Sequence, residues 1–210
     1  SPEEERSGAM TNILNATPAQ NFITGTFNST SSSYQDSLNK TIKDQIPGIT
    51  VAPGDSILFT DNITIDLLLP VIKTGVPVSD TLIPRITYGD VKFLLMGDAP
   101  TASGEVQAQI IRIADHGSAQ GTDPWFLRNV SPEVAIISTE EYSKGPIPRE
   151  AISNLENSGA TVYRTDRDGI IIITTDGTSY NIEKIRMEPE NTYSIVSVIE
   201  TRAPVPYPKK

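Results

Sequence analysis

Residues 134–175, VAIISTEEYSKGPIPREAISNLENSGATVYRTDRDGIIIITT, decide the fold class. The apolar run 134–138 predicts a strand, and residues 148–157 predict a helix that ends at Ser158-Gly159. Two more strands are predicted at 160–164 and 170–175. Strands with a helix between them are typical of an α/β layer architecture. Because the isoleucines of 170–173 are too apolar for a solvent-facing strand, we expect that strand to be central and buried on both faces.

The same kind of pattern continues on both sides of this stretch. Gly89-Asp90 is a favourable tight-turn pair and predicts a hairpin between its flanking strands. The helices outside 134–175 are expected at four places: 3–14, 34–46, 104–109 and 124–129. The other strands are expected at short β-prone runs: 21–24, 57–59, 63–65, 67–69, 85–88, 91–96, 110–114, 178–182 and 193–200. We expect one α/β domain over 1–185 and a β-prone, Pro-rich extension over 186–210.

Composition excludes several classes of function. The chain has 210 residues, a net charge of −9, one histidine and no cysteine. Phosphate binding needs clustered Lys and Arg, so a nucleic-acid partner is not expected. Without cysteine there is neither a disulfide nor a thiolate metal site. No run approaches the roughly 18 apolar residues of a membrane span, and residues 1–5 do not resemble a signal peptide.

Sequons for N-glycosylation point to an exported protein. The pattern Asn-X-Ser/Thr, without Pro in the middle, occurs at five glycosylation candidates: Asn15, Asn28, Asn39, Asn62 and Asn129. Any one of them is explained by chance in a chain rich in Ser, Thr and Asn. Together they favour an extracellular or cell-surface location and glycans as a modification.

Four segments occur in the order and spacing of one known family: KFLLMGD at 92–98, IRIADHGS at 111–118, PEVAIIS at 132–138, and VYRTD at 162–166 followed by Gly169. They resemble motifs of the metallo-β-lactamase-fold hydrolases of the ComEC type, the domain attached to bacterial DNA-uptake channels. The resemblance implies a four-layer αββα sandwich with mixed β-sheets, of which this chain carries mainly the C-terminal half. The sheet's inner face would be covered by upstream residues, by 49–69, or by another copy.

The chain departs from that family where metals would bind. Positions 1–9 align with the family's motif H-x-x-x-D-H-x-G-G, but Ser1 and Arg6 stand at the histidines and Glu5 at the aspartate. A hydrolytic dizinc site needs several neutral imidazoles and a bridging carboxylate. The resemblance therefore implies a degenerate site with no catalytic residue, metal or cofactor, and leaves three vestigial candidates: Asp98, Asp115 and His116.

Other interpretations of single residues remain open. A Ca²⁺ or Mg²⁺ ion near Asp98, held with Asp115 and main-chain oxygens, is conceivable, as is an Arg6–Asp98 ion pair in place of the metal. The carboxylates Glu140-Glu141 and Asp166/Asp168 are more typical of solvated turns. Trp125 and Phe126 fit a ligand-stacking pair less well than the core face of a helix.

The leading hypothesis is a non-catalytic extracellular structural protein that assembles with itself into a surface layer, sheath or filament through strand and sheet contacts. In composition the chain is similar to surface-layer or sheath proteins of methanogenic archaea, although no motif carries that similarity. One alternative is a metal-dependent hydrolase, such as a nuclease or phosphodiesterase, with further ligands upstream. Another is a module that binds a peptide, glycan or wall polymer.

Overall fold

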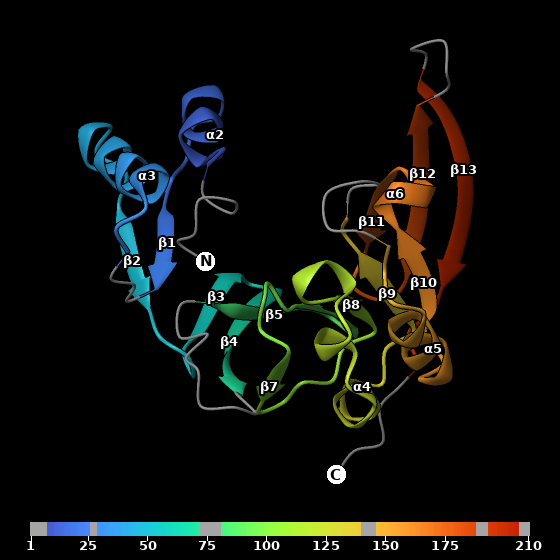
Figure 1. Cartoon of the computed structure of the whole chain (residues 1–210). Coiled ribbons are helices and arrows are strands. Elements are labelled where there is room, and N and C mark those ends of the chain that lie inside the picture. Colours follow the sequence, from blue (N-terminus) through green and yellow to red (C-terminus); the bar gives the residue numbers. More distant parts are fainter. Residues whose placement is uncertain (1–7, 26–28, 72–80, 140–145, 188–192, 206–210) are drawn as a thin grey trace.

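The computed structural model describes residues 8–25, 29–71, 81–139, 146–187 and 193–205. Most of them build a layered α/β body around one large sheet (Figure 1). The strands of this sheet lie in the order β10 (Thr161–Arg164), β9 (Val134–Ile137), β8 (Ile110–Arg112), β6 (Val91–Leu95), β5 (Ile83–Tyr88), β4 (Ile63–Val71) and β3 (Ser56–Thr60). Strand β7 (Thr101–Ser103) pairs with the end of β4.

The large sheet is mixed. Strands β6, β8, β9 and β10 run parallel to one another, whereas β3 to β6 are joined as antiparallel neighbours. Gly89-Asp90 makes the tight turn between β5 and β6, as the sequence predicted. The predicted α/β class with mixed sheets is confirmed.

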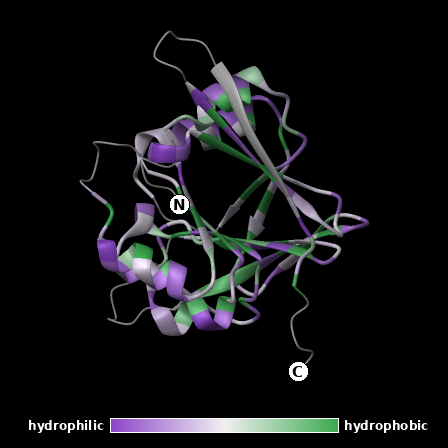
Figure 2. Cartoon of the chain, turned by 90° about the vertical axis from the view of Figure 1, so that its right-hand side faces the viewer, coloured by the Kyte–Doolittle hydropathy of each residue, from purple (hydrophilic) through white to green (hydrophobic). Residues whose placement is uncertain are grey.

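Alternating side chains give the large sheet two apolar faces. On one face, Leu94, Ile111 and Ile137 pack against the helices α4 (Pro124–Val130) and α5 (Arg149–Asn157). On the other face, Ile110 and Val134 pack against a second sheet. Because strand side chains alternate between faces, one set of strands supplies both cores. In Figure 2, green segments run along the strands at the centre of the molecule, whereas purple is frequent in the helices.

The second sheet has three antiparallel strands in the order β11 (Ile170–Thr175), β12 (Tyr180–Met187) and β13 (Tyr193–Arg202). The expectation that 170–173 form a central strand buried on both faces is wrong. Strand β11 lies at an edge, Ile170 is 53% exposed, and only one side of the strand packs on the large sheet through Ile171 and Ile173. Strand β13 attaches residues 193–202 to the same sheet by pairing with β12.

A turn-to-turn contact holds the two sheets together. The amide of Asp90, in the β5–β6 turn, donates to the carbonyl oxygen of Gly177, in the β11–β12 turn, over 2.7 Å. A Cβ added at Gly89 would lie 2.3 Å from that same oxygen, and Gly89 has φ +57°. Glycine is therefore required at position 89 by both conformation and space.

The N-terminal part forms a smaller unit of α2 (Met10–Ala16), β1 (Phe22–Gly25), α3 (Ser32–Lys43) and β2 (Gly48–Val51), in which β1 and β2 pair in parallel. Parallel strands need a crossover connection, which α3 provides. Ile23 and Ile49 are partners in this pair and both are partly exposed, at 36% and 39%.

Three local predictions need correction. Residues 104–109 form no helix but a connection after β7, because Val106 and Ala108 are drawn into the core while Glu105 pairs with Arg85. The predicted strands 63–65 and 67–69 are one continuous strand, β4. The turn predicted at 166–169 includes a short helix, α6 (Thr165–Asp168). Of the helix predicted at 3–14, the described part begins at Met10. Among the described residues, no helix has the length and apolarity of a membrane span.

Candidate functional site

The parallel strands place several loops at one edge of the large sheet. Because β6, β8, β9 and β10 run the same way, the segments that follow them meet at their carboxyl ends. Ligands of open α/β sheets bind at this kind of edge. The residues there that the sequence analysis singled out are Asp98 after β6 and Asp115 and His116 after β8.

The structure brings the three candidates to this common edge. The amide of Asp115 donates to the carbonyl oxygen of Gly97 over 3.1 Å, which ties the two loops together. Asp98 is half-buried and Asp115 is exposed. Asp115 and His116 have φ values of 43° and 54°, a left-handed conformation that is uncommon for residues other than glycine.

The only histidine is oriented by the main chain. Its Nδ1 lies 2.7 Å from the carbonyl oxygen of Ser138, which follows β9. A carbonyl oxygen can only accept, so Nδ1 of His116 carries a proton and donates it to the Ser138 oxygen. Histidines that bind metals are commonly oriented in this way.

The donor set nevertheless does not fit a pair of hydrolytic metal ions. Across residues 8–25, 29–71, 81–139, 146–187 and 193–205, no group of three or more His, Cys, Asp or Glu residues could hold a metal. Zinc prefers nitrogen and sulfur donors, and the chain has one imidazole and no thiol. Ser1, Glu5 and Arg6 lie outside the described residues, and so does the predicted Arg6–Asp98 ion pair.

A buried carboxylate, Asp168, organises the neighbouring end of β10. Asp168 is 3% exposed and accepts the amide of Arg164 at 2.9 Å and Nη2 of Arg167 at 2.9 Å. Lys184 Nζ and Arg186 Nη2, both from β12, lie 3.5 and 3.7 Å from its other oxygen. Burial raises the pKa of this carboxyl group, but the bonds from Arg167 and the Arg164 amide outweigh burial and leave the pKa below its ordinary 3.8.

The hypothesis that Asp166 and Asp168 are solvated turn residues is therefore wrong. Asp166 makes a two-bond ion pair with Arg164, through Nε and Nη2, and its side chain is 13% exposed. The bond from Arg164 keeps the pKa of Asp166 low despite burial. These carboxylates hold β10, α6 and β12 together, a structural role. Glu140-Glu141 lies outside the described residues.

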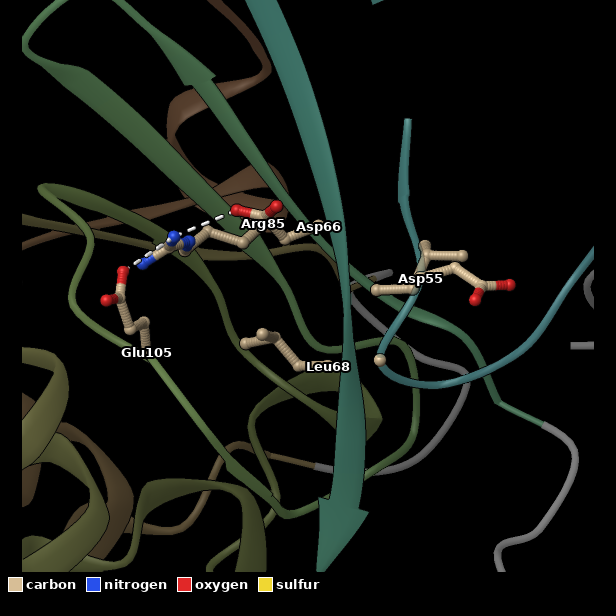
Figure 3. Close-up of a pocket in the computed structure, with 7 residues that line it drawn as sticks. Asp55, Asp66, Leu68, Arg85 and Glu105 are labelled. Carbon is tan, nitrogen blue, oxygen red and sulfur yellow. Dashed lines mark hydrogen bonds and ion pairs between the residues drawn. The ribbon is translucent and has the colours of Figure 1, made fainter. Parts of the chain in front are cut away.

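A second polar cluster lines a pocket of about 240 Å³ on the other half of the large sheet. Arg85 on β5 lies between two carboxylates, with Nη2 2.8 Å from Asp66 and 3.1 Å from Glu105 (Figure 3). Arg85 is 7% exposed, whereas the Glu105 side chain is 82% exposed. Burial raises the pKa of Asp66, but hydrogen bonds from Arg85 and Ser56 lower it below its ordinary value.

The C-terminal segment is fixed by a third group, Glu133. One carboxylate oxygen of Glu133 accepts the hydroxyl of buried Tyr180 at 2.8 Å, and the other accepts the amide of Val205 at 2.7 Å. Burial, and then the bond to Glu133, raise the pKa of Tyr180. Glu133 therefore connects β9, β12 and the tail.

The aromatic pair at the start of α4 is divided between core and solvent. Phe126 is 1% exposed and belongs to the core, whereas Trp125 is 67% exposed. Sequence reasoning missed the roles of Glu133 and Arg85 because their partners are far away in the chain. It missed the role of Asp168 because two of its four partners, Lys184 and Arg186, come from the distant strand β12. Within VYRTDRDG, the closely spaced charges of 164–168 were the one available signal.

A comparison of sequences supports the ComEC-type resemblance. The chain is 29% identical over 97 residues to the Competence protein ComA of Neisseria gonorrhoeae. The match covers 41% of this chain and 14% of ComA, so most of that protein has no counterpart here. No family model matches the sequence.

Two solved structures are similar to the chain at low sequence identity. One is a candidate metal-dependent hydrolase from Parabacteroides distasonis, with a TM-score of 0.46 and 14% identity, covering 75% of this chain and 79% of that one. The other is Zn²⁺-bound PqqB from Methylobacterium extorquens, with a TM-score of 0.45 and 10% identity, covering 75% of this chain and 66% of that one.

Proposed function

We propose that this chain is a non-catalytic, extracellular structural protein that assembles with copies of itself into a surface layer, sheath or filament. The observation that carries the proposal is the donor set at the carboxyl ends of β6 and β8. There, one imidazole and two carboxylates stand where water activation by a metal pair needs several imidazoles.

The surface supports assembly. Large apolar side chains are exposed on the strands at one end of the large sheet: Leu58 at 70%, Phe59 at 61% and Leu69 at 53%. Clustered exposed apolar side chains are a common mark of protein–protein contacts. A net charge of −9 keeps separate copies soluble until such contacts form.

The sequons support an extracellular location. Asn15, Asn39, Asn62 and Asn129 are all exposed, so a glycan at any of them would point into solvent. Asn28 lies outside the described residues. The mass of the native protein from its own organism tests this part: sugar mass on these peptides supports export, and unmodified peptides at all the sequons contradict glycosylation.

Electron microscopy and metal analysis together test the whole proposal. We expect ordered sheets, tubes or filaments in native preparations, and less than stoichiometric zinc, manganese or iron in the purified protein. A monodisperse monomer at every concentration would contradict assembly. Stoichiometric transition metal together with hydrolysis of a phosphodiester would contradict the absence of catalysis.

The alternative function is a metal-dependent hydrolase that receives further ligands from residues preceding Ser1. It is favoured by the main-chain hydrogen bond that orients His116, a feature common to metal-binding histidines, and by the match to ComA. Replacing His116 with Ala separates the two functions. A hydrolase loses bound metal and activity with His116→Ala, whereas a structural protein keeps its assembly unchanged.

A further inference from the structure

The two edge strands of the large sheet, β10 and β3, differ, and the outer edge of β10 is blocked against pairing with another strand. The amide of Thr161 donates to Glu133 on the β9 side, so by alternation the main chain of Val162 and Arg164 faces away from β9. The carbonyl oxygen of Val162 accepts Arg167 Nη2 at 3.1 Å, and the amide of Arg164 donates to Asp168 at 2.9 Å. Side chains of α6 thus occupy the edge of β10 that an added strand would need.

At the opposite end, strand β3 has an unpaired edge among the residues that the structure describes. Its pairing partner is β4 on one side only. In the part of the chain that the structure describes, no side chain bonds to the main chain of residues 56–60. The strand also carries Leu58 and Phe59, which are 70% and 61% exposed. An edge with free main-chain groups and exposed apolar side chains is a template for strand addition.

The sequence of β3 limits which strand can be added. Residues 56–60, SILFT, carry no charge in a chain whose net charge is −9. A register shift between Leu58 and Thr60 places a bulge at Phe59, so the regular part of the strand is short and a paired strand would be centred near Leu58.

We propose that β3 pairs antiparallel with β3 of a second copy of this chain, around a two-fold axis near Leu58. This inference rests on the proposed self-assembly and names its first contact. Within residues 56–60 no charged side chains would face each other in such a pair. Because α6 closes β10, the same sheet cannot continue into a third copy, and the contact is isologous and stops at two.

The flanking residues give the contact a distinct salt dependence. Asp55 and Asp61 lie just outside the two ends of β3, and both are exposed. A two-fold axis near Leu58 brings Asp55 of each copy toward Asp61 of the other. These like charges repel, and salt screens repulsion between exposed charges. Dimerisation should therefore strengthen with increasing ionic strength.

The first experiment places a charge on the edge. Analytical ultracentrifugation of the wild type should show a monomer–dimer equilibrium, and Leu58→Lys should weaken dimerisation by about tenfold or more. Trp125→Lys is the matched control, because Trp125 is 67% exposed on α4 and should leave the equilibrium unchanged. A monomeric wild type, or an equal loss in both variants, would overturn the inference.

The second experiment uses the absence of cysteine. A single Leu58→Cys change should give rapid disulfide-linked dimers under mild oxidation, because the two-fold axis brings both copies of residue 58 together. Trp125→Cys should cross-link at least about tenfold more slowly, at the rate of random collision. Equal cross-linking rates would contradict the proposed axis even if the protein dimerises.

These outcomes are separable from those of the proposed function. Ordered arrays that persist in Leu58→Lys would refute the β3 contact and leave self-assembly standing. Salt-strengthened dimers that never form larger arrays would support the β3 contact and refute the surface layer.

Discussion

At the scale of the residue, Asp168 shows how a buried charge is kept. Three cationic side chains and a main-chain amide surround one carboxylate that is almost fully buried. Such a group costs free energy to bury, and it stays ionised because its partners lower the pKa by more than burial raises it.

Replacing Asp168 with Asn should destabilise the protein by about 1 to 3 kcal/mol at pH 7, because the buried side chain loses its charge-assisted bonds to Arg167, Lys184 and Arg186, which remain partly solvated. The folded-state pKa lies below the unfolded one, so this stabilisation is fully present above about pH 5 and is lost as pH falls toward the folded pKa. Urea denaturation at a series of pH values should show the difference between wild type and Asp168→Asn shrinking below about pH 5. Asp61→Asn, on the surface, is the control, and a pH-independent difference would contradict the assignment.

A second prediction at this scale concerns Gly89. Gly89→Ala should cost about 2 to 4 kcal/mol, because alanine disfavours a positive φ and its Cβ would overlap the Gly177 carbonyl oxygen. Gly48→Ala is the control, since nothing lies within 4 Å of a Cβ there and no positive φ is required. Chemical denaturation measures both, and equal effects would contradict the turn-to-turn contact.

At the scale of the element, local sequence signals were sufficient to predict helices and turns whose contacting residues are also close in the sequence. The hairpin through Gly89-Asp90 and the helices α4 and α5 were predicted for this reason. The run 170–173 was misplaced because apolarity shows that a strand is buried somewhere, but not how many strands flank it. Residues 104–109 do not form a helix because their apolar side chains pack into the core between β4 and β8. This packing depends on residues that are distant in the sequence.

The attachment of the C-terminal segment by Glu133 gives a prediction for this scale. Glu133→Ala removes the acceptors of both Tyr180 and Val205, so residues after Arg202 should detach and become sensitive to proteases. Limited proteolysis with mass spectrometry should show faster cleavage there. Glu133→Gln retains one carbonyl acceptor, so its cleavage rate should lie between those of the wild type and Glu133→Ala. Cleavage of Glu133→Ala as slow as that of the wild type would contradict the role of Glu133 as a tether.

At the scale of the whole molecule, stability should be uneven. The large sheet is packed on both faces, whereas the β1–β2 pair has only two strands and leaves Ile23 and Ile49 partly exposed. Hydrogen exchange should therefore be slowest in β6, β8 and β9 and at least about tenfold faster in β1 and β2. Equal protection in both regions would contradict this difference in stability.

The candidate site could be predicted only in outline at this scale. Strand order brings Asp98, Asp115 and His116 to one edge, as the ComEC-type resemblance implied. The charged cluster around Asp168 also includes Lys184 and Arg186 of β12, and no short-range pattern predicts that long-range contact. What a sequence lacks, here several imidazoles, is visible without any structure.

The hydrogen bond between His116 and Ser138 has a practical consequence. Since the chain contains one histidine, its two carbon-bound ring protons give the one pair of imidazole NMR signals of the protein. These signals act as a built-in probe. A small molecule, ion or second protein that binds at this edge changes their chemical shifts, and one that binds elsewhere does not.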